Sequence, residues 1–275
     1  MDPDFWLGPD IQRVLMNDPH SYPQPKTRLP PKDQLIMGIH TVTEVLQHAP
    51  ERFIRLFTEM PRQKGRKSDL LTLFEKKGIP ITFTSFENLC HMTSSDSHQS
   101  MVAHVKGREF LNVSQFLKRV EEQDRVLVLM VDQIFDPQNF GALLRSGECA
   151  GASAVVWSKN RGSDLTPVAT KASSGASELL SLIRISNLAE AVSEFQEGGF
   201  EAVAALADPR AESAFSFRFA PRTLLIVGSE GEGIQPLIQK RATRSIYIPL
   251  QGKIESLNVA QATSVLLFSY VKEKI

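Results

Sequence analysis

The 275-residue chain contains only two cysteines, Cys90 and Cys149. Two thiols are too few for a disulfide framework or a four-ligand zinc site, and they do not form a Cys-x-x-Cys pair. Histidine is also unevenly distributed, because all six histidines precede residue 105. Chemistry in the C-terminal half must therefore proceed without an imidazole, and we expect no bound metal.

The sequence has no long apolar run and no excess of either charge. No segment approaches the roughly 18 consecutive apolar residues that cross a membrane, and the first residues lack the basic and apolar regions of a signal peptide. Basic and acidic side chains balance at 31 each, and 42% of the residues are hydrophobic. This composition excludes collagen, coiled coils and wholesale disorder, and it predicts a cytoplasmic protein of one or two domains without a membrane partner.

Proline is concentrated at the start of the chain, where seven of the 16 prolines fall within the first 31 residues. We interpret residues 1–34 as a flexible tail. Over residues 35–107, helical spacing near residues 42–46 and 69–77 alternates with strand patterns at 54–58, 81–84 and 101–105. The pattern predicts a small α/β domain here, followed by a linker at residues 108–125.

The rest of the chain alternates regularly between strand-like runs and helical or glycine-rich stretches. The six runs are residues 126–131, 154–157, 182–185, 202–206, 224–227 and 245–250. Several are apolar throughout, which is typical of a parallel sheet covered on both faces. Residues 126–275 are therefore predicted to form an α/β domain whose ligands bind at the carboxyl ends of the strands.

A polar segment follows the first of these runs. It contains, in order, Asp136, Pro137, Asn139, Gly141 and Arg145. Asn139 is expected to cap a helix, and Arg145 follows six residues later, within two helical turns. Taken alone, the segment is equally compatible with an ordinary capped helix that carries a surface arginine.

Two further segments follow later strands. Residues 228–233 read Gly-Ser-Glu-Gly-Glu-Gly, so the backbone can close tightly around a ligand while Glu230 supplies an acceptor. The loop matches neither a P-loop, a dinucleotide fingerprint nor a nucleophile elbow, and alone it is a weak signal. Residues 251–258 precede an amphipathic terminal helix, for which Ser256 is the expected N-cap, although its hydroxyl could instead hold a ligand.

Together the three segments resemble the SpoU (TrmH-type) RNA ribose 2′-O-methyltransferases of the SPOUT superfamily. The resemblance rests on the motif from Asp136 to Arg145, on residues 225–233, and on Ile248-Pro249-Leu250 with Ser256-Leu257-Asn258-Val259. In the small domain, residues 38–42, 49–53 and 98–99 resemble the substrate-recognition domain of the RlmB-like bacterial enzymes, which modify a guanosine of large-subunit ribosomal RNA. The sequence departs from the family pattern at residues 253–255 and 260–261.

The resemblance implies a trefoil-knotted C-terminal methyltransferase domain, a homodimer, and S-adenosylmethionine as cofactor. The positions that match the family's cofactor contacts are Gly228, Ile248 and Leu257. Those that match its catalytic neighbourhood are Asn139, Arg145, Glu230, Ser256 and Asn258.

A guanidinium is a poor base, because it keeps its proton at any pH at which a protein functions. We therefore assign Arg145 to holding the target phosphate and stabilising the developing alkoxide, while a phosphate oxygen or water accepts the proton. Glu230 and Asn139 then orient the reactants.

Despite the zero net charge, one stretch of the small domain is strongly basic. Over residues 52–67, Glu59 is the only acidic residue among six basic ones, namely Arg52, Arg55, Arg62, Lys64, Arg66 and Lys67. We interpret this stretch as the RNA-binding surface, against the alternative of a solvated surface turn.

The sequence thus predicts an RNA (guanosine-2′-O)-methyltransferase acting on large-subunit ribosomal RNA. Two alternatives remain. One is a transfer-RNA ribose methyltransferase, because the catalytic motifs are shared. The other is a non-catalytic RNA-binding ribosome-assembly factor, which the presence of Asn139, Arg145 and Glu230 disfavours.

Overall fold

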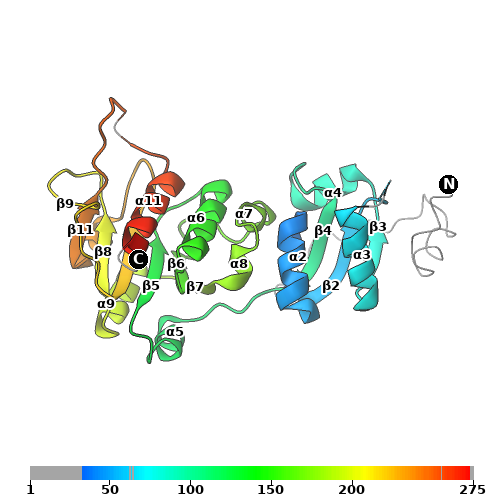
Figure 1. The fold of residues 1–275 in the computed structure, drawn as a ribbon, viewed down its shortest axis with the longest axis horizontal. Coiled ribbons are helices and arrows are strands. Elements are labelled where there is room, and N and C mark those ends of the chain that lie inside the picture. Colours follow the sequence, from blue (N-terminus) through cyan, green and yellow to red (C-terminus); the bar gives the residue numbers. More distant parts are fainter. Residues whose placement is uncertain (1–32, 62, 64, 255, 273–275) are drawn as a thin grey trace. The chain divides into compact units, whose positions relative to one another are not determined.

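A computed structural model of the chain describes residues 33–61, 63, 65–254 and 256–272 (Figure 1). Most of the predicted tail, and two of the predicted RNA-binding residues, Arg62 and Lys64, lie outside the described residues. The chain divides into two compact units. The N-terminal unit runs to Arg108 and includes residues 166–171, and the C-terminal unit holds the rest.

The N-terminal unit is built on a four-stranded sheet with the order β1-β4-β2-β3. Strands β1 (Asp33–Met37) and β2 (Phe53–Thr58) are antiparallel to β4 (Met101–Lys106), while β3 (Ile81–Phe83) is parallel to β2. The predicted strands are confirmed, but β1 was not predicted. It begins two residues before the expected domain start, and its first three side chains are only partly buried, so it lacks a strong apolar pattern.

Helices α2 (Ile39–His48) and α3 (Arg66–Lys76) occur where the helical spacing predicted them. The short 3-10 helix η2 (Pro50–Arg52) and helix α4 (Phe86–Thr93) complete the unit. Val42, Leu46 and Phe74 are buried in one apolar cluster with the sheet, and the rings of Phe53 and Phe74 meet edge to face at 4.8 Å. This core accounts for a separate N-terminal unit of modest size.

The C-terminal unit contains a seven-stranded sheet with the order β7-β6-β5-β10-β8-β11-β9, in which every pairing is parallel. Its strands are β5 (Val126–Val131), β6 (Ala154–Ser158), β7 (Ser181–Ile185), β8 (Glu201–Ala205), β9 (Glu212–Ser213), β10 (Arg222–Val227) and β11 (Arg244–Tyr247). The six predicted strands and the parallel sheet are confirmed. One boundary is wrong: β11 ends at Tyr247 and not at Leu250, because Pro249 cannot donate to a sheet.

From residue 113 onward, the described part of the chain contains seven helices, which connect or cover these strands. They are α5 (Val113–Arg119), α6 (Pro137–Cys149), α7 (Pro167–Ala172), α8 (Ala176–Leu179), α9 (Leu188–Glu197), α10 (Pro236–Arg241) and α11 (Val259–Val271). Most of α7 is grouped with the N-terminal unit. None of the helices in the described part of the chain has the length and apolar character needed to span a membrane.

The sheet is covered on both faces, as its all-apolar strands predicted. Val128 and Met130 of β5 pack in one cluster with side chains of α5, α9 and α10. The intervening Leu129 faces α6, where a Cβ at Gly147 would lie 3.7 Å from the Leu129 side chain. Helices α6 and α11 lie beside each other (Figure 1). The ends of these two helices and of the central strands surround the site described next.

Candidate functional site

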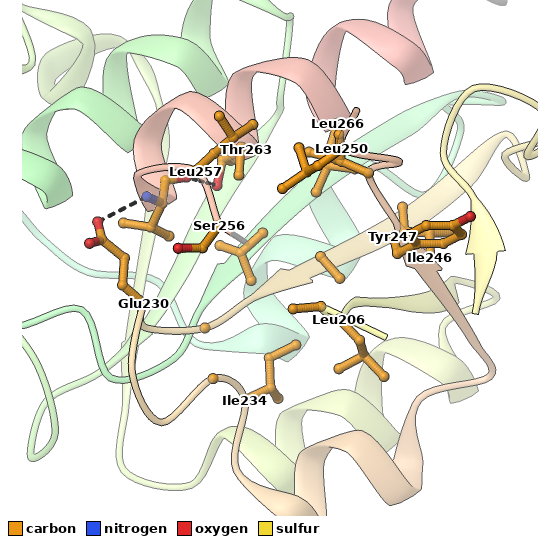
Figure 2. Close-up of a pocket in the computed structure, with 18 of the residues that line it drawn as sticks. Leu206, Glu230, Ile234, Ile246, Tyr247, Leu250, Ser256, Leu257, Thr263 and Leu266 are labelled. Carbon is orange, nitrogen blue, oxygen red and sulfur yellow. Dashed lines mark hydrogen bonds between the residues drawn. The ribbon is translucent and has the colours of Figure 1, made fainter. Parts of the chain in front are cut away.

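An open pocket of about 850 Å³ lies in the C-terminal unit at the carboxyl ends of β8, β10 and β11. The glycine loop (residues 228–233), the segment from Ile246 to Gly252 and the first turns of α11 form its walls, with apolar side chains such as Leu206, Ile234 and Leu266 between them (Figure 2). Among the described residues that line it, the charged ones are Glu230 and Glu232. The pocket therefore offers apolar contacts, backbone groups and negative charge.

The glycine loop folds back on itself so closely that residue 228 has no room for a side chain. Gly233 donates its backbone N–H to the carbonyl of Ser229 at 3.1 Å. A Cβ on Gly228 would lie 2.2 Å from the carbonyl carbon of Gly233 and 2.4 Å from the backbone nitrogen of Ile234. By contrast, a Cβ on Gly231 would have nothing within 4 Å. Gly228 is thus required by packing, whereas Gly231 is not.

A polar junction of three side chains joins the three predicted motifs. Asn258 Nδ2 donates to Asn139 Oδ1 at 3.0 Å and to Glu230 Oε1 at 2.8 Å. Glu230 Oε1 also accepts the backbone N–H of Val259 at 3.0 Å, so the carboxylate sits at the N-terminus of α11 (Figure 2). A negative charge is favourable there because the helix dipole is positive at that end. We call Asn139, Glu230 and Asn258 the asparagine junction.

Both predicted helix caps are wrong, and the corrections explain the junction. Asp136 caps α6, because its carboxylate accepts the N–H groups of Gln138 at 3.0 Å and Asn139 at 3.2 Å. The Asp-Pro pair is itself a cap signal, since proline suits the first helical position. With the cap supplied by Asp136, the Asn139 side chain bonds to Asn258 instead.

The cap of α11 is likewise not Ser256. Asn258 fills this position, and its Oδ1 accepts the N–H of Ala260 at 3.0 Å. One amide side chain therefore both ends the preceding loop and links two distant motifs. Ser256 is exposed and lines the pocket, together with Gly228, Ile248 and Leu257. The structure thus brings all three predicted cofactor-binding positions to one cavity.

Arg145 lies on the exposed side of α6, six residues after Asn139 and about 9 Å further along the helix axis. Within the described part of the chain it forms no hydrogen bond or ion pair. Its guanidinium is therefore available to a ligand from outside the protein. Arg145 is not joined to the asparagine junction by a hydrogen bond.

The predicted RNA-binding residues are spread along the N-terminal unit. Arg52 ends η2 just before β2, and Arg55 is exposed on β2. Arg66 and Lys67 begin α3, after the other end of that strand. Arg52 and Arg55 therefore lie before and within β2, and Arg66 and Lys67 come after its end.

One of these cations is partly withdrawn from solvent. Burial lowers the pKa of Lys67, and the nearby carboxylate of Glu59 opposes this shift. Arg66 Nη2 lies 3.4 Å from His40 Nδ1, at the first turn of α2. No cluster of three or more potential metal-binding side chains occurs among the residues whose positions are described.

Comparison with known proteins places the chain in a family. Residues 126–268 match the model of the SpoU rRNA Methylase family, and residues 35–111 match the model for RNA 2′-O ribose methyltransferase substrate binding. The chain belongs to the SpoU rRNA methylase family. Among its relatives is the 23S rRNA (guanosine-2′-O-)-methyltransferase RlmB of Haemophilus influenzae, 33% identical over 240 residues, which are 87% of this chain and 98% of the relative. The Escherichia coli protein of that name is 33% identical over 242 residues, 88% and 99% of the two chains.

Solved structures of SpoU methyltransferases share the fold. AviRb from Streptomyces viridochromogenes, in complex with AdoMet, has a TM-score of 0.74 at 19% identity and covers 88% of this chain and 91% of its own. An AdoMet-bound rRNA methyltransferase from Sinorhizobium meliloti has a TM-score of 0.71 at 19% identity, covering 89% and 88%. These similarities confirm the predicted α/β fold with a parallel sheet.

The glycine loop provides a test of the pocket. Replacing Gly228 by alanine should weaken the binding of S-adenosylmethionine, the cofactor that the motifs imply, because the added methyl group collides with backbone atoms. Overpacking of about 1–3 kcal/mol corresponds to a loss of roughly 5- to 150-fold in affinity. The control Gly65→Ala, in the N-terminal unit and outside the pocket, should bind within about threefold of wild type, since a Cβ there has no atom within 4 Å. Titration calorimetry measures both, and equal affinities for the two variants would refute the packing argument.

Proposed function

We propose that this SpoU-family protein transfers a methyl group from S-adenosylmethionine to the ribose 2′-hydroxyl of a guanosine in large-subunit ribosomal RNA. The relatives named for this reaction align with 87–88% of the chain, across both matched segments. The observation that carries the proposal is the asparagine junction, which gathers one residue from each motif at the edge of the pocket. An intact junction also argues against a scaffold that has lost catalysis.

The residues present suit S-adenosylmethionine. The pocket falls within the range of about 300–1,000 Å³ that is usual for small-molecule sites. Its apolar walls and exposed loop backbone suit an adenine and a ribose, while Glu230 and Glu232 complement the positive sulfonium. Gly228, Ile248 and Leu257 are the proposed cofactor-binding positions. When bound, the cofactor supplies a methyl group on a sulfur atom that leaves without needing a proton.

The protein must then promote loss of the proton from the ribose 2′-hydroxyl, which is a very weak acid. We assign Arg145 to the target phosphate and to the negative charge that develops on the 2′-oxygen, with a phosphate oxygen or water taking the proton. The asparagine junction fixes the carboxylate of Glu230, and Ser256 contributes a hydroxyl to the pocket. Positioning and electrostatics can together supply several kcal/mol without a histidine.

The remaining parts of the proposal concern the two halves of the chain. Residues 35–107 contact the RNA through the six basic residues named above, and residues 126–275 bind the cofactor. The SpoU resemblance further supports a trefoil knot in the C-terminal domain and a homodimer. Neither the tail at residues 1–34 nor the linker at 108–125 is assigned a chemical role.

The reaction is tested with purified protein, tritiated S-adenosylmethionine and large-subunit ribosomal RNA. Methylation of a 2′-hydroxyl blocks alkaline cleavage of the adjacent phosphodiester bond, so the label should appear in an alkali-resistant dinucleotide that contains guanosine. Transfer-RNA in a parallel reaction should remain unlabelled. Label recovered as a methylated base, or in transfer RNA alone, would overturn the proposal.

The role of Arg145 is tested by its replacement with lysine. If the planar fork holds phosphate and alkoxide, Arg145→Lys should lower the single-turnover rate by about 10²-fold at every pH, with little change in cofactor affinity. If Arg145 were instead a base, lysine would deprotonate more easily and recover activity at high pH.

Single-turnover rates from about pH 6.5 to 10 separate the two roles. Arg119→Lys, at an exposed position in the last turn of α5, is the matched control and should leave the rate unchanged. Recovery of Arg145→Lys to the wild-type rate at alkaline pH would contradict the electrostatic role.

A further inference from the structure

Phe135 exposes an aromatic ring directly beside the catalytic motifs. Its side chain is 64% exposed, more than any other phenylalanine among the described residues. It forms no ring contact with the part of the chain that the structure describes. Its neighbour Ile134 is buried, and Asp136 on its other side caps α6. Phe135 therefore points into solvent from between two anchored residues.

The loop that carries Phe135 is anchored at its start by a buried carboxylate. Asp132 is fully buried at the end of β5, and its backbone N–H donates to the carbonyl of Val227 at 2.9 Å. Its Oδ2 accepts the backbone N–H of Gln235 at 2.7 Å, and its Oδ1 accepts Gln235 Nε2 at 2.7 Å. Because Gln235 follows the glycine loop, these bonds tie the Phe135 loop to the wall of the cofactor pocket.

The middle of the loop is also fixed. The carbonyl of Ile134 accepts the N–H of Ser163 at 2.6 Å. Gly162 packs so closely that a Cβ there would lie 3.0 Å from that carbonyl oxygen. The backbone on both sides of Phe135 is therefore held by hydrogen bonds, which lowers the entropy cost of presenting the ring to a ligand.

The short distance along the chain between Phe135 and Asn139 of the asparagine junction determines which part of a bound RNA Phe135 can contact. Asn139 follows four residues later, so the two Cα atoms are at most about 14 Å apart even for extended chain. The intervening turn of α6 shortens this distance. A ring at this place lies within reach of the nucleotides that adjoin a ribose held at the asparagine junction.

We propose that Phe135 is a substrate-positioning residue that stacks on a base of the RNA, at or next to the target nucleotide. Sequence-specific RNA recognition targets unpaired bases, which stack on aromatic side chains. Stacking on a fixed ring would place the ribose without adding charge near the sulfonium. This inference rests on the proposed function and adds a contact that the three motifs do not include.

Three substitutions separate stacking from simple apolar contact. Phe135→Ala should weaken binding of large-subunit ribosomal RNA by roughly 5- to 100-fold, the range for losing one stacked base. Phe135→Leu, which keeps apolar area but has no π face, should lose most of that affinity, whereas Phe135→Trp should retain it. Phe215→Ala is the matched control, because Phe215 is 56% exposed and lies outside the pocket lining and the asparagine junction.

Each full-length variant is measured for RNA affinity, KM and kcat of methyl transfer, cofactor affinity and unfolding midpoint. The loss should fall on RNA affinity and KM, with cofactor affinity and the unfolding midpoint unchanged. Fluorescence of Phe135→Trp should be quenched by RNA more strongly than that of wild type.

Wild-type affinity in Phe135→Ala, or full affinity in Phe135→Leu, would overturn the stacking role and leave the proposed function intact. A change in sedimentation on Phe135→Ala would also overturn it, by assigning the ring to a protein contact. Failure of the wild type to bind or methylate the RNA would overturn the proposed function, and the stacking role with it.

Discussion

The two hydrogen bonds from the Asn258 amide hold the functional site together. One goes to Asn139 on α6 and the other to Glu230 in the glycine loop, while the carbonyl oxygen of the same amide caps α11. These residues are 119 and 28 positions from Asn258 in the chain. An uncharged side chain with two N–H donors and one acceptor is therefore the point at which three segments of the C-terminal unit converge. The geometry of the pocket rim depends on it.

The strands that carry these segments could be predicted because strands of a parallel sheet covered on both faces are continuous apolar runs in the sequence. A run such as residues 126–131 is apolar at every position, and all six side chains are buried. Strand β1 and helix α4 escaped prediction because each buries only two side chains, Ile36 and Met37 in β1 and Leu89 and Thr93 in α4, which is too few for a clear apolar pattern. The elements of the core can thus be predicted from their hydrophobic pattern, whereas the peripheral elements are determined by tertiary contacts that the sequence pattern does not show.

The candidate site was only partly accessible from local sequence rules. Those rules placed caps at Asn139 and Ser256, whereas Asp136 and Asn258 occupy the two positions. Several residues near each helix start are good caps, and the choice depends on bonds to distant groups. The motif resemblance supplied the roles of Asn139, Glu230 and Asn258, but no spacing along the chain shows that their side chains meet. Likewise, the composition of residues 52–67 could not show which basic residues lie on β2 and which on α3.

In the proposed mechanism the asparagine junction positions the groups around the pocket, and no side chain acts as a general base. Replacing Asn258 by serine tests this most directly, because serine retains a good helix cap but cannot bond to both Asn139 and Glu230. The single-turnover rate of methyl transfer, measured at saturating cofactor and RNA, should fall by about 10²-fold, because Asn139 and Glu230 lose the bonds that position them, while the unfolding midpoint stays near that of wild type. A wild-type rate in Asn258→Ser would contradict the central claim.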